Sequence, residues 1–226
     1  MTLKCRKCPY QSELYKMLTD TQLDAIDAHR VEMSYEAGEV IVKQGTSCTH
    51  VISFVDGLAK MHISTPAGRN LILRFIRPKE FIAATPLKKE TRYRFSITAV
   101  EHTRICLIDV DVIRELVKQN KDFSLGILDH FHQHLLAMMN KLVSFYQKQH
   151  IGRLAESLLY LSDEVYRKNP MDLSITKSEI AELAGISKEN CFRLMHSLQD
   201  DKIIRVNKRY IEILDRARLN LYSLNG

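Results

Sequence analysis

The sequence predicts an α+β protein in three parts: an antiparallel β-roll of the jelly-roll kind, one long helix and a winged helix-turn-helix. Three observations lead to this order. Short runs rich in Val, Ile and Phe recur between residues 33 and 110, with turn residues between them. Apolar residues then repeat at steps of three and four from Phe123 to Tyr146. Two capped helical segments separated by a glycine follow within residues 175–194.

Composition limits the class of protein. The chain has 226 residues with 45% hydrophobic content, enough to bury a substantial core. No apolar run reaches the length of a membrane span, and the first residues, MTLKCRKCPY, lack the apolar segment of a signal peptide. Five cysteines without regular spacing favour a reducing compartment over a disulfide framework. We therefore expect a cytoplasmic protein with no membrane partner.

The net charge of +6 does not by itself indicate nucleic-acid binding. Residues 151–226 hold 12 Lys and Arg against 11 Asp and Glu, so the positive excess lies upstream of the helix-turn-helix. An argument for DNA binding therefore depends on where the basic residues are placed.

Six runs are predicted as strands of the β-roll. Turns are expected at Gly38, at Gly45, at Asp56-Gly57 and at residues 66–68, and Asp-Gly between two such runs favours a hairpin. Strands at this spacing predict a barrel or jelly roll, which encloses a ligand or packs solid. The predicted strands are 39–43, 51–55, 58–63, 71–76, 97–99 and 105–108.

The long helix carries a heptad seam, which is typical of a helix that pairs with another. Four further apolar residues, Ile127, Phe131, Met138 and Phe145, widen its apolar face. We expect one face to pack on its own subunit and the other on a twin, although a purely intrachain core helix shows the same pattern. The seam residues are Leu125, Leu128, His132, Leu135, Met139, Leu142 and Tyr146.

The helix-turn-helix lies in ITKSEIAELAGISKENCFRL. Thr176 and Glu179 form a capping box, Gly185 accepts a left-handed turn, and Ser187 caps the second helix. Residues Lys202–Val206 and Arg209–Leu214 then alternate polar and apolar like the two strands of a wing. The apolar faces of the helices are Ile180, Leu183 and Ala184 on the first and Cys191, Leu194 and Leu198 on the second.

Polar residues on the second helix face solvent in its first turns, where a recognition helix meets the major groove. The predicted base-reading residues are Lys188, Glu189, Asn190 and Arg193. The predicted phosphate-contacting residues are Thr176, Ser187, Lys202, Arg205, Lys208 and Arg209. The alternative is an ordinary helical hairpin.

In this order of parts the chain resembles the cAMP receptor protein and fumarate–nitrate reduction regulator (CRP/FNR) family of bacterial transcription factors. The resemblance runs from about Leu14 to Leu214 and is most specific in two places. One is the β-roll, with Gly38-Glu39, Gly45 and Asp56-Gly57, and the other is Ser187-Lys-Glu-Asn-x-x-Arg193. It implies a cyclic nucleotide-binding-like domain over residues 1–120, a dimerisation helix over 121–148 and a DNA-binding domain over 149–226.

By this likeness the protein is a sequence-specific transcription regulator that binds a palindromic site as a homodimer. Glu189 and Arg193 match the family's base-reading pair: Arg193 donates to a guanine edge and Glu189 accepts from a cytosine amine. The alternative for this pair is an i,i+4 surface salt bridge. Double-stranded DNA, a second copy, RNA polymerase and an unidentified small-molecule effector are the partners that the resemblance implies.

The chain departs from the family at the effector pocket. Members that bind cyclic nucleotides hold the ribose with Gly-Glu and the phosphate with a following Arg-Ser. Aligned without gaps, this chain has Ala83 and Ala84 at the first pair and Tyr93 and Arg94 at the second, with Arg92 beside them. Alanine accepts nothing from a ribose hydroxyl, and a one-residue shift restores a cation but not the acid. We therefore expect an effector other than a cyclic nucleotide, and the cofactor is unknown.

Cysteines suggest a second kind of effector. Oxygen-sensing members of the family hold an iron–sulfur cluster with N-terminal cysteines and one cysteine late in the β-roll, which Cys106 matches. Such a cluster takes four thiolates, whereas this chain offers Cys5 and Cys8 at its N-terminus. Cys48 has no family counterpart, and Cys191 fits the helix-turn-helix core. For Cys5 and Cys8, a cluster, a zinc or redox dithiol, and a disordered tail stay open.

His130 and His134 stand one helical turn apart, the spacing of two metal ligands on one face. Because no third ligand is evident from spacing, we interpret them as solvated flanks of the long helix and predict no metal site.

The function predicted first is therefore DNA-binding regulation. A redox- or metal-sensing protein that uses Cys5 and Cys8, with degenerate DNA binding, is the alternative. A thiol oxidoreductase is the third hypothesis, but no coherent set of nucleophile, base and orienting residue is present, so we predict that the protein is not an enzyme.

Overall fold

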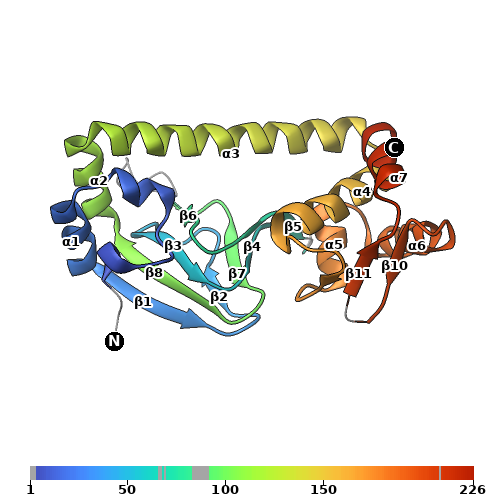
Figure 1. Cartoon of the computed structure of the whole chain (residues 1–226), viewed down its shortest axis with the longest axis horizontal. Coiled ribbons are helices and arrows are strands. Elements are labelled where there is room, and N and C mark those ends of the chain that lie inside the picture. The colour runs from blue at the N-terminus through green and yellow to red at the C-terminus, as the bar shows by residue number, and fades with distance from the viewer. Residues whose placement is uncertain (1–3, 66–67, 69, 83–91, 209) are drawn as a thin grey trace. The chain divides into compact units, whose positions relative to one another are not determined.

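The computed structural model describes residues 4–65, 68, 70–82, 92–208 and 210–226 (Figure 1). The chain divides into two compact units, one formed by Met1–Ser64 and Phe75–Leu136 and the other by Thr65–Arg74 and Ala137–Gly226. The strand β5 (Asn70–Ile76) and the helix α3 (Lys121–Gln147) each contribute residues to both. None of the described helices combines the length and the apolar composition needed to cross a bilayer.

The β-roll consists of two antiparallel four-stranded sheets with the strand orders β1-β8-β3-β6 and β2-β7-β4-β5. In both, strands distant in sequence are neighbours, as in a jelly roll. The predicted antiparallel β-roll is confirmed. The remaining strands are β1 (Arg30–Tyr35), β2 (Val40–Val42), β3 (His50–Asp56), β4 (Ala59–Ser64), β6 (Phe81–Ile82), β7 (Ser96–Ala99) and β8 (Thr103–Asp109).

All six predicted strands are present, but β1 and β6 were not predicted. The strand β1 lies at a sheet edge beside β8, and two of its residues are the charged Arg30 and Glu32. Residues 30–35 nevertheless alternate polar and apolar as a strand does, so the signal for β1 is present in the sequence and was missed. The strand β6 has two residues, which is too short for any periodicity to show.

The core of the first unit joins the sheet to the helices that cover it. These are α1 (Asp20–Ala28), α2 (Val110–Gln119), the start of α3 and two short 3-10 helices, η1 (Cys5–Lys7) and η2 (Glu13–Met17). Each Ile or Phe buried here contributes about 1.5–3 kcal/mol to folding. The cluster comprises Cys5, Leu14, Tyr15, Leu23, Ile26, Val51, Phe81, Ile108, Val110, Ile113, Leu116, Phe123 and Ile127.

The segment around Cys5 is not a disordered tail, which corrects one of the alternatives left open by the sequence. The thiol of Cys5 is buried in the core, and its backbone N–H donates to the carboxylate of Asp27 at 2.8 Å. Arg30 Nε lies 2.8 Å from the same carboxylate. The N-terminal residues are thus tied to α1 and to the first strand.

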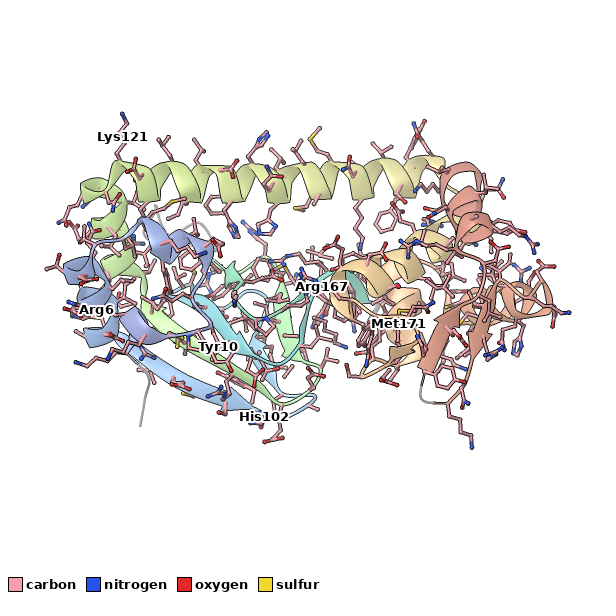
Figure 2. All side chains as sticks on the ribbon, viewed as in Figure 1. Arg6, Tyr10, His102, Lys121, Arg167 and Met171 are labelled. Atoms are coloured by element: carbon pink, nitrogen blue, oxygen red, sulfur yellow. The ribbon has the colours of Figure 1, made fainter. Side chains whose placement is uncertain are left out.

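The helix α3 presents two apolar faces, as predicted. Phe123 and Ile127 are buried in the core of the first unit, and Phe131 is half-buried against it. The seven seam residues are all exposed, with Leu128 at 65% and Tyr146 at 91%. Figure 2 shows side chains along one side of α3, at the top of the view, that extend into open space. One face therefore packs on its own subunit, while the twin expected on the other face stays a prediction.

The second unit contains the helix-turn-helix and its wing. Strands β10 and β11 pair antiparallel, with Ile204 opposite Ile213, which confirms the predicted two-stranded wing. A third strand, β9, and the last helix, α7, were not predicted. The elements are α4 (His150–Tyr160), a π-helical turn η3 (Leu161–Val165), β9 (Met171–Asp172), α5 (Lys177–Ala184), α6 (Lys188–Asp200), β10 (Ile204–Val206), β11 (Tyr210–Ile213) and α7 (Arg216–Asn225).

The predicted hairpin at Asp56-Gly57 gives a test of the β-roll. Gly57 has φ +89°, and a Cβ there would lie 2.3 Å from the carbonyl oxygen of His102 and 2.7 Å from the Cα of Thr103. Gly45 has a similar φ of +87°, but nothing lies within 4 Å of its Cβ position. We expect Gly57→Ala to lower the free energy of unfolding by about 2 kcal/mol more than Gly45→Ala, because both variants strain the backbone but only the first adds a backbone clash. Denaturant unfolding measures both, and equal losses would contradict this close approach.

Candidate nucleic-acid interface

Local backbone chemistry fixes the first helix of the motif. The Thr176 hydroxyl accepts from the N–H of Glu179 at 3.2 Å, and the Glu179 carboxylate accepts from the N–H of Thr176 at 2.6 Å. This is the predicted capping box, which satisfies two donors that the helix leaves open. The helix ends at Gly185, which has φ +62° and ψ +38°. The N–H of Ile186 then donates to the carbonyl of Ala181 at 3.1 Å and closes the turn.

Ser187 begins α6 by accepting from the N–H of Asn190 at 3.2 Å. Cys191 and Leu198 are buried, as predicted. Leu194 is only half-buried, however, and Met195 takes the buried position beside Cys191. The middle position of the buried face is therefore Met195 and not Leu194. Residues three and four positions apart both lie on one face of a helix, so the spacing alone did not distinguish the two.

Three of the four predicted base-reading residues are exposed on the first turns of α6: Lys188, Glu189 and Arg193. The fourth, Asn190, is half-buried. Its side-chain oxygen accepts from Arg193 Nη2 at 3.3 Å, and its side-chain nitrogen lies 3.3 Å from His150 Nδ1 in α4. Asn190 thus links the Arg193 guanidinium to the body of the second unit.

The electrostatics of this helix start favour a charged Glu189. Hydrogen bonds from its own backbone N–H and from the Ser187 hydroxyl lower the pKa of Glu189, and nearby Lys188 acts in the same direction. Within the part of the chain that the structure describes, no ion pair joins Glu189 to Arg193. Both residues are exposed, and their side chains bond to groups of the same helix start, Arg193 to Asn190 and Glu189 to Ser187 and its own backbone.

The predicted phosphate-contacting residues divide into two groups. Thr176 and Ser187 are the N-caps of α5 and α6, so their hydroxyls already serve the helix starts. Lys202 and Lys208 are exposed at the two ends of β10, whereas Arg205 is held at 2.7 Å by Glu212 across the wing. The remaining one, Arg209, lies outside the described residues.

The aromatic ring of Phe145 packs beside the turn between α5 and α6, and two cations, Arg153 and Lys141, lie next to that ring. A Cβ on Gly185 would lie 3.0 Å from the ring of Phe145, and Arg153 lies over that ring at 5.6 Å and donates to the carbonyl of Gly185 at 3.2 Å. Lys141 Nζ lies 5.6 Å from the same ring centre and donates to the carbonyls of Ile72 and Leu73 at 2.7 and 3.0 Å. Burial lowers the pKa of Lys141 to about 8. Sequence reasoning missed Lys141 and Arg153, because their contacts join residues far apart in the chain.

The predicted effector residues are only partly described, since Ala83 and Ala84 lie outside the described residues. The buried Tyr93 donates its hydroxyl to the carbonyl of His50 at 2.9 Å, and the exposed Arg92 donates to the carbonyl of Gly45 at 2.8 Å. Arg94 is exposed. Two of the five thus bind the backbone of the β-roll.

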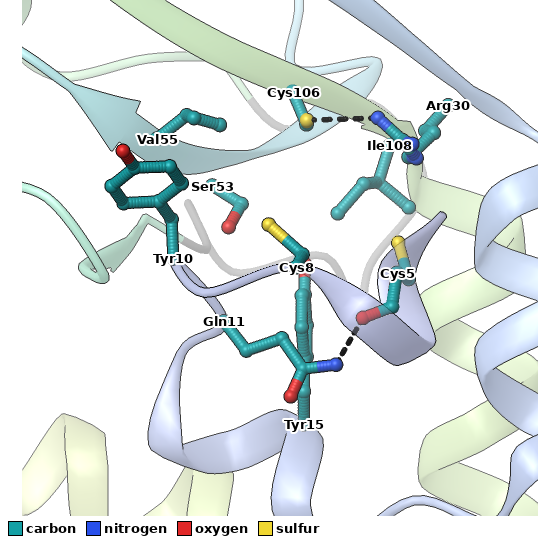
Figure 3. Close-up of a pocket in the computed structure, with 10 residues that line it drawn as sticks. All are labelled: Cys5, Cys8, Tyr10, Gln11, Tyr15, Arg30, Ser53, Val55, Cys106 and Ile108. Carbon is teal, nitrogen blue, oxygen red and sulfur yellow. Dashed lines mark hydrogen bonds between the residues drawn. The ribbon is translucent and has the colours of Figure 1, made fainter. Parts of the chain in front are cut away.

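Three cysteines meet in a small cavity of the first unit. Cys5, Cys8 and Cys106 line it together with Arg30 and Ser53, and Figure 3 shows the sulfur atoms of Cys8 and Cys106 directed into the same space. Arg30 Nη1 lies 3.2 Å from the sulfur of Cys106. Burial raises the pKa of Cys5 to about 12 and also raises that of Cys106, although Arg30 opposes the shift of Cys106. Among the described residues no three His, Cys, Asp or Glu side chains are arranged to hold a metal ion.

Comparison with known proteins gives two family models that match two separate parts of the chain. Residues 32–120 match the cyclic nucleotide-binding domain, and residues 152–222 match the Crp-like helix-turn-helix domain.

Relatives and solved structures match along most of the chain. The cAMP-activated global transcriptional regulator CRP of Salmonella typhimurium is 24% identical and covers 88% of this chain and 97% of its own length. The transcriptional activator protein FnrL of Cereibacter sphaeroides is 23% identical and covers 96% of this chain and 90% of its own. The structure of FixK2 from Bradyrhizobium japonicum is similar with a TM-score of 0.78 at 19% identity, covering 87% of this chain and 98% of its own.

Proposed function

The chain belongs to the CRP/FNR family of DNA-binding transcription regulators, and on that premise we propose that it reads a palindromic operator as a homodimer. Members of the family are regulators rather than enzymes. The working parts that we propose are an effector domain over residues 1–120, a dimerisation helix over 121–148 and a DNA-binding domain over 149–226. DNA binding of this kind takes place in the cytoplasm of a bacterium, where RNA polymerase is the natural further partner.

One observation carries the DNA-reading part of the proposal: Lys188, Glu189 and Arg193 are exposed on the capped first turns of α6. A guanidinium fork matches the O6 and N7 acceptors of guanine, and a carboxylate accepts from the cytosine amine. Asn190 bonds to Arg193 and so limits where the fork can point. We assign base reading to Glu189 and Arg193, and phosphate contacts to Lys202 and Lys208.

The exposed seam of α3 supports the dimer. Its leucines, methionine and tyrosine are too large and too contiguous to be ordinary scattered surface residues. A second copy of the same helix offers a surface of matching chemistry, and a two-fold dimer presents two α6 helices to two half-sites.

We propose further that an effector acts on the first unit and that it is not a cyclic nucleotide, since alanines stand where that ligand needs a glutamate. The cavity of Cys5, Cys8 and Cys106 favours a second candidate function, a redox sensor. Burial opposes it, because raised pKa values keep Cys5 and Cys106 as slowly reacting thiols. If this candidate holds, peroxide oxidises Cys8 and one of the other two thiols to a disulfide and changes the DNA affinity of the full-length protein. A Cys8→Ser variant then no longer responds, whereas equal affinity before and after peroxide removes the candidate.

Arg193 provides the test of base reading. We expect Arg193→Ala to weaken binding to the preferred duplex by about 1–3 kcal/mol and to lose discrimination at one base pair. Arg193→Lys is the matched control, since lysine keeps the positive charge but loses the bidentate fork. Binding isotherms on the preferred site and on its single-base variants measure both. Full discrimination in Arg193→Lys would reduce Arg193 to a phosphate contact.

A further inference from the structure

His130 and His134 are not the solvated flanks that the sequence predicts. Both are half-buried, and their rings meet edge to face with centres 4.4 Å apart. The ring of His130 also lies against Phe81 and Phe131, with centres 6.5 Å away in each case. Contacts within the first unit therefore hold this histidine in place.

The Nε2 atoms of the two histidines are 3.1 Å apart. A metal ion bound by two imidazoles at about 2.0–2.1 Å each, at angles between square and tetrahedral, requires nitrogens about 2.9–3.4 Å apart. The observed separation falls inside that interval without any movement of the helix. The i,i+4 spacing on one helix face is the spacing that metal-binding histidine pairs use.

A backbone carbonyl lies close to the same pair of nitrogens. His130 Nε2 lies 2.8 Å from the carbonyl oxygen of Phe81, so in the absence of an ion it must carry the proton that this bond needs. His134 Nε2 lies 3.1 Å from the same nitrogen, so one oxygen and one nitrogen both lie within hydrogen-bond distance of His130 Nε2. A divalent cation attracts all three atoms at once.

We propose that His130 and His134 form a bidentate site for a divalent transition-metal ion of the Zn²⁺, Ni²⁺ or Cu²⁺ class. Imidazole suits these ions, whereas Mg²⁺ and Ca²⁺ prefer oxygen ligands. The Phe81 carbonyl is placed to add an oxygen donor, and water fills the open positions. On binding, the ion takes the place of the Nε2 proton of His130, which moves to Nδ1 or to solvent.

The site lies where α3 contacts the strand β6. Phe81 belongs to β6, and the residues predicted for the effector pocket, Ala83 and Ala84, follow β6 directly in the sequence. An ion at His130 and His134 therefore acts where α3 contacts β6. The metal site stands independently of the DNA-reading proposal, and its test uses no DNA.

Titration of the full-length protein with NiCl₂ tests the site, with binding followed by calorimetry. We expect one Ni²⁺ per chain and affinity lower by about tenfold or more in His134→Gln, because a chelate that loses one imidazole keeps a single anchor. His134→Gln retains the bond between His130 and Phe81, so it disturbs the fold least. The matched control is His102→Gln, which removes an exposed histidine of the first unit outside α3 and leaves the affinity within about twofold of wild type.

Thiols are the competing ligands, and a cobalt spectrum separates them from imidazoles. Co²⁺ bound at His130 and His134 gives ligand-field bands without sulfur-to-cobalt charge transfer, and a Cys5→Ser, Cys8→Ser double variant leaves the spectrum unchanged. Absence of Ni²⁺ binding in the wild type, unchanged affinity in His134→Gln, or an equal loss in His102→Gln would each overturn the proposal.

Discussion

A row of exposed apolar side chains along α3, which needs a partner surface to cover it, is the constraint on which the proposed dimer depends. Leu125, Leu128, Leu135, Met139 and Leu142 are all more than half exposed over several turns of one helix. Each such side chain contributes about 1.5–3 kcal/mol when it is covered. Association itself costs about 4–15 kcal/mol, so a stable dimer needs most of the row and not a single contact. The continuity of the seam from Leu125 to Tyr146 meets that requirement.

The C-terminal end of the same helix packs against the helix-turn-helix within the second unit. Phe145, near the end of α3, lies against Gly185 in the turn of the helix-turn-helix, and Arg153 bonds to the Gly185 carbonyl while lying over the Phe145 ring. Gly185 itself occupies a left-handed conformation that side chains rarely adopt. The start of α6 is therefore fixed by its backbone, by the Ser187 cap and by this aromatic contact. A rigid start matters because a base-reading side chain loses discrimination if its helix can shift.

Local signals in the sequence were sufficient to predict the helix-turn-helix and most strands. The capping box at Thr176 and Glu179, the turn at Gly185 and the hairpin at Asp56-Gly57 are set by residues within a few positions of each other, so their chemistry is legible in the sequence. Features set by distant residues were missed. The contact of Lys141 with Ile72 and Leu73 joins segments almost 70 residues apart, and the convergence of Cys5, Cys8 and Cys106 depends on how the first unit closes. His130 was misjudged for the same reason, since Phe81 is its partner.

Selection of preferred sequences from a random duplex library by the full-length protein tests the central claim most directly. If two copies pair along α3 and each lays Glu189 and Arg193 on base edges, the enriched sites contain two inverted half-sites with centres about 10–10.5 base pairs, or a multiple of that spacing, apart. Enrichment of a single asymmetric half-site, or of no sequence at all, would contradict the account.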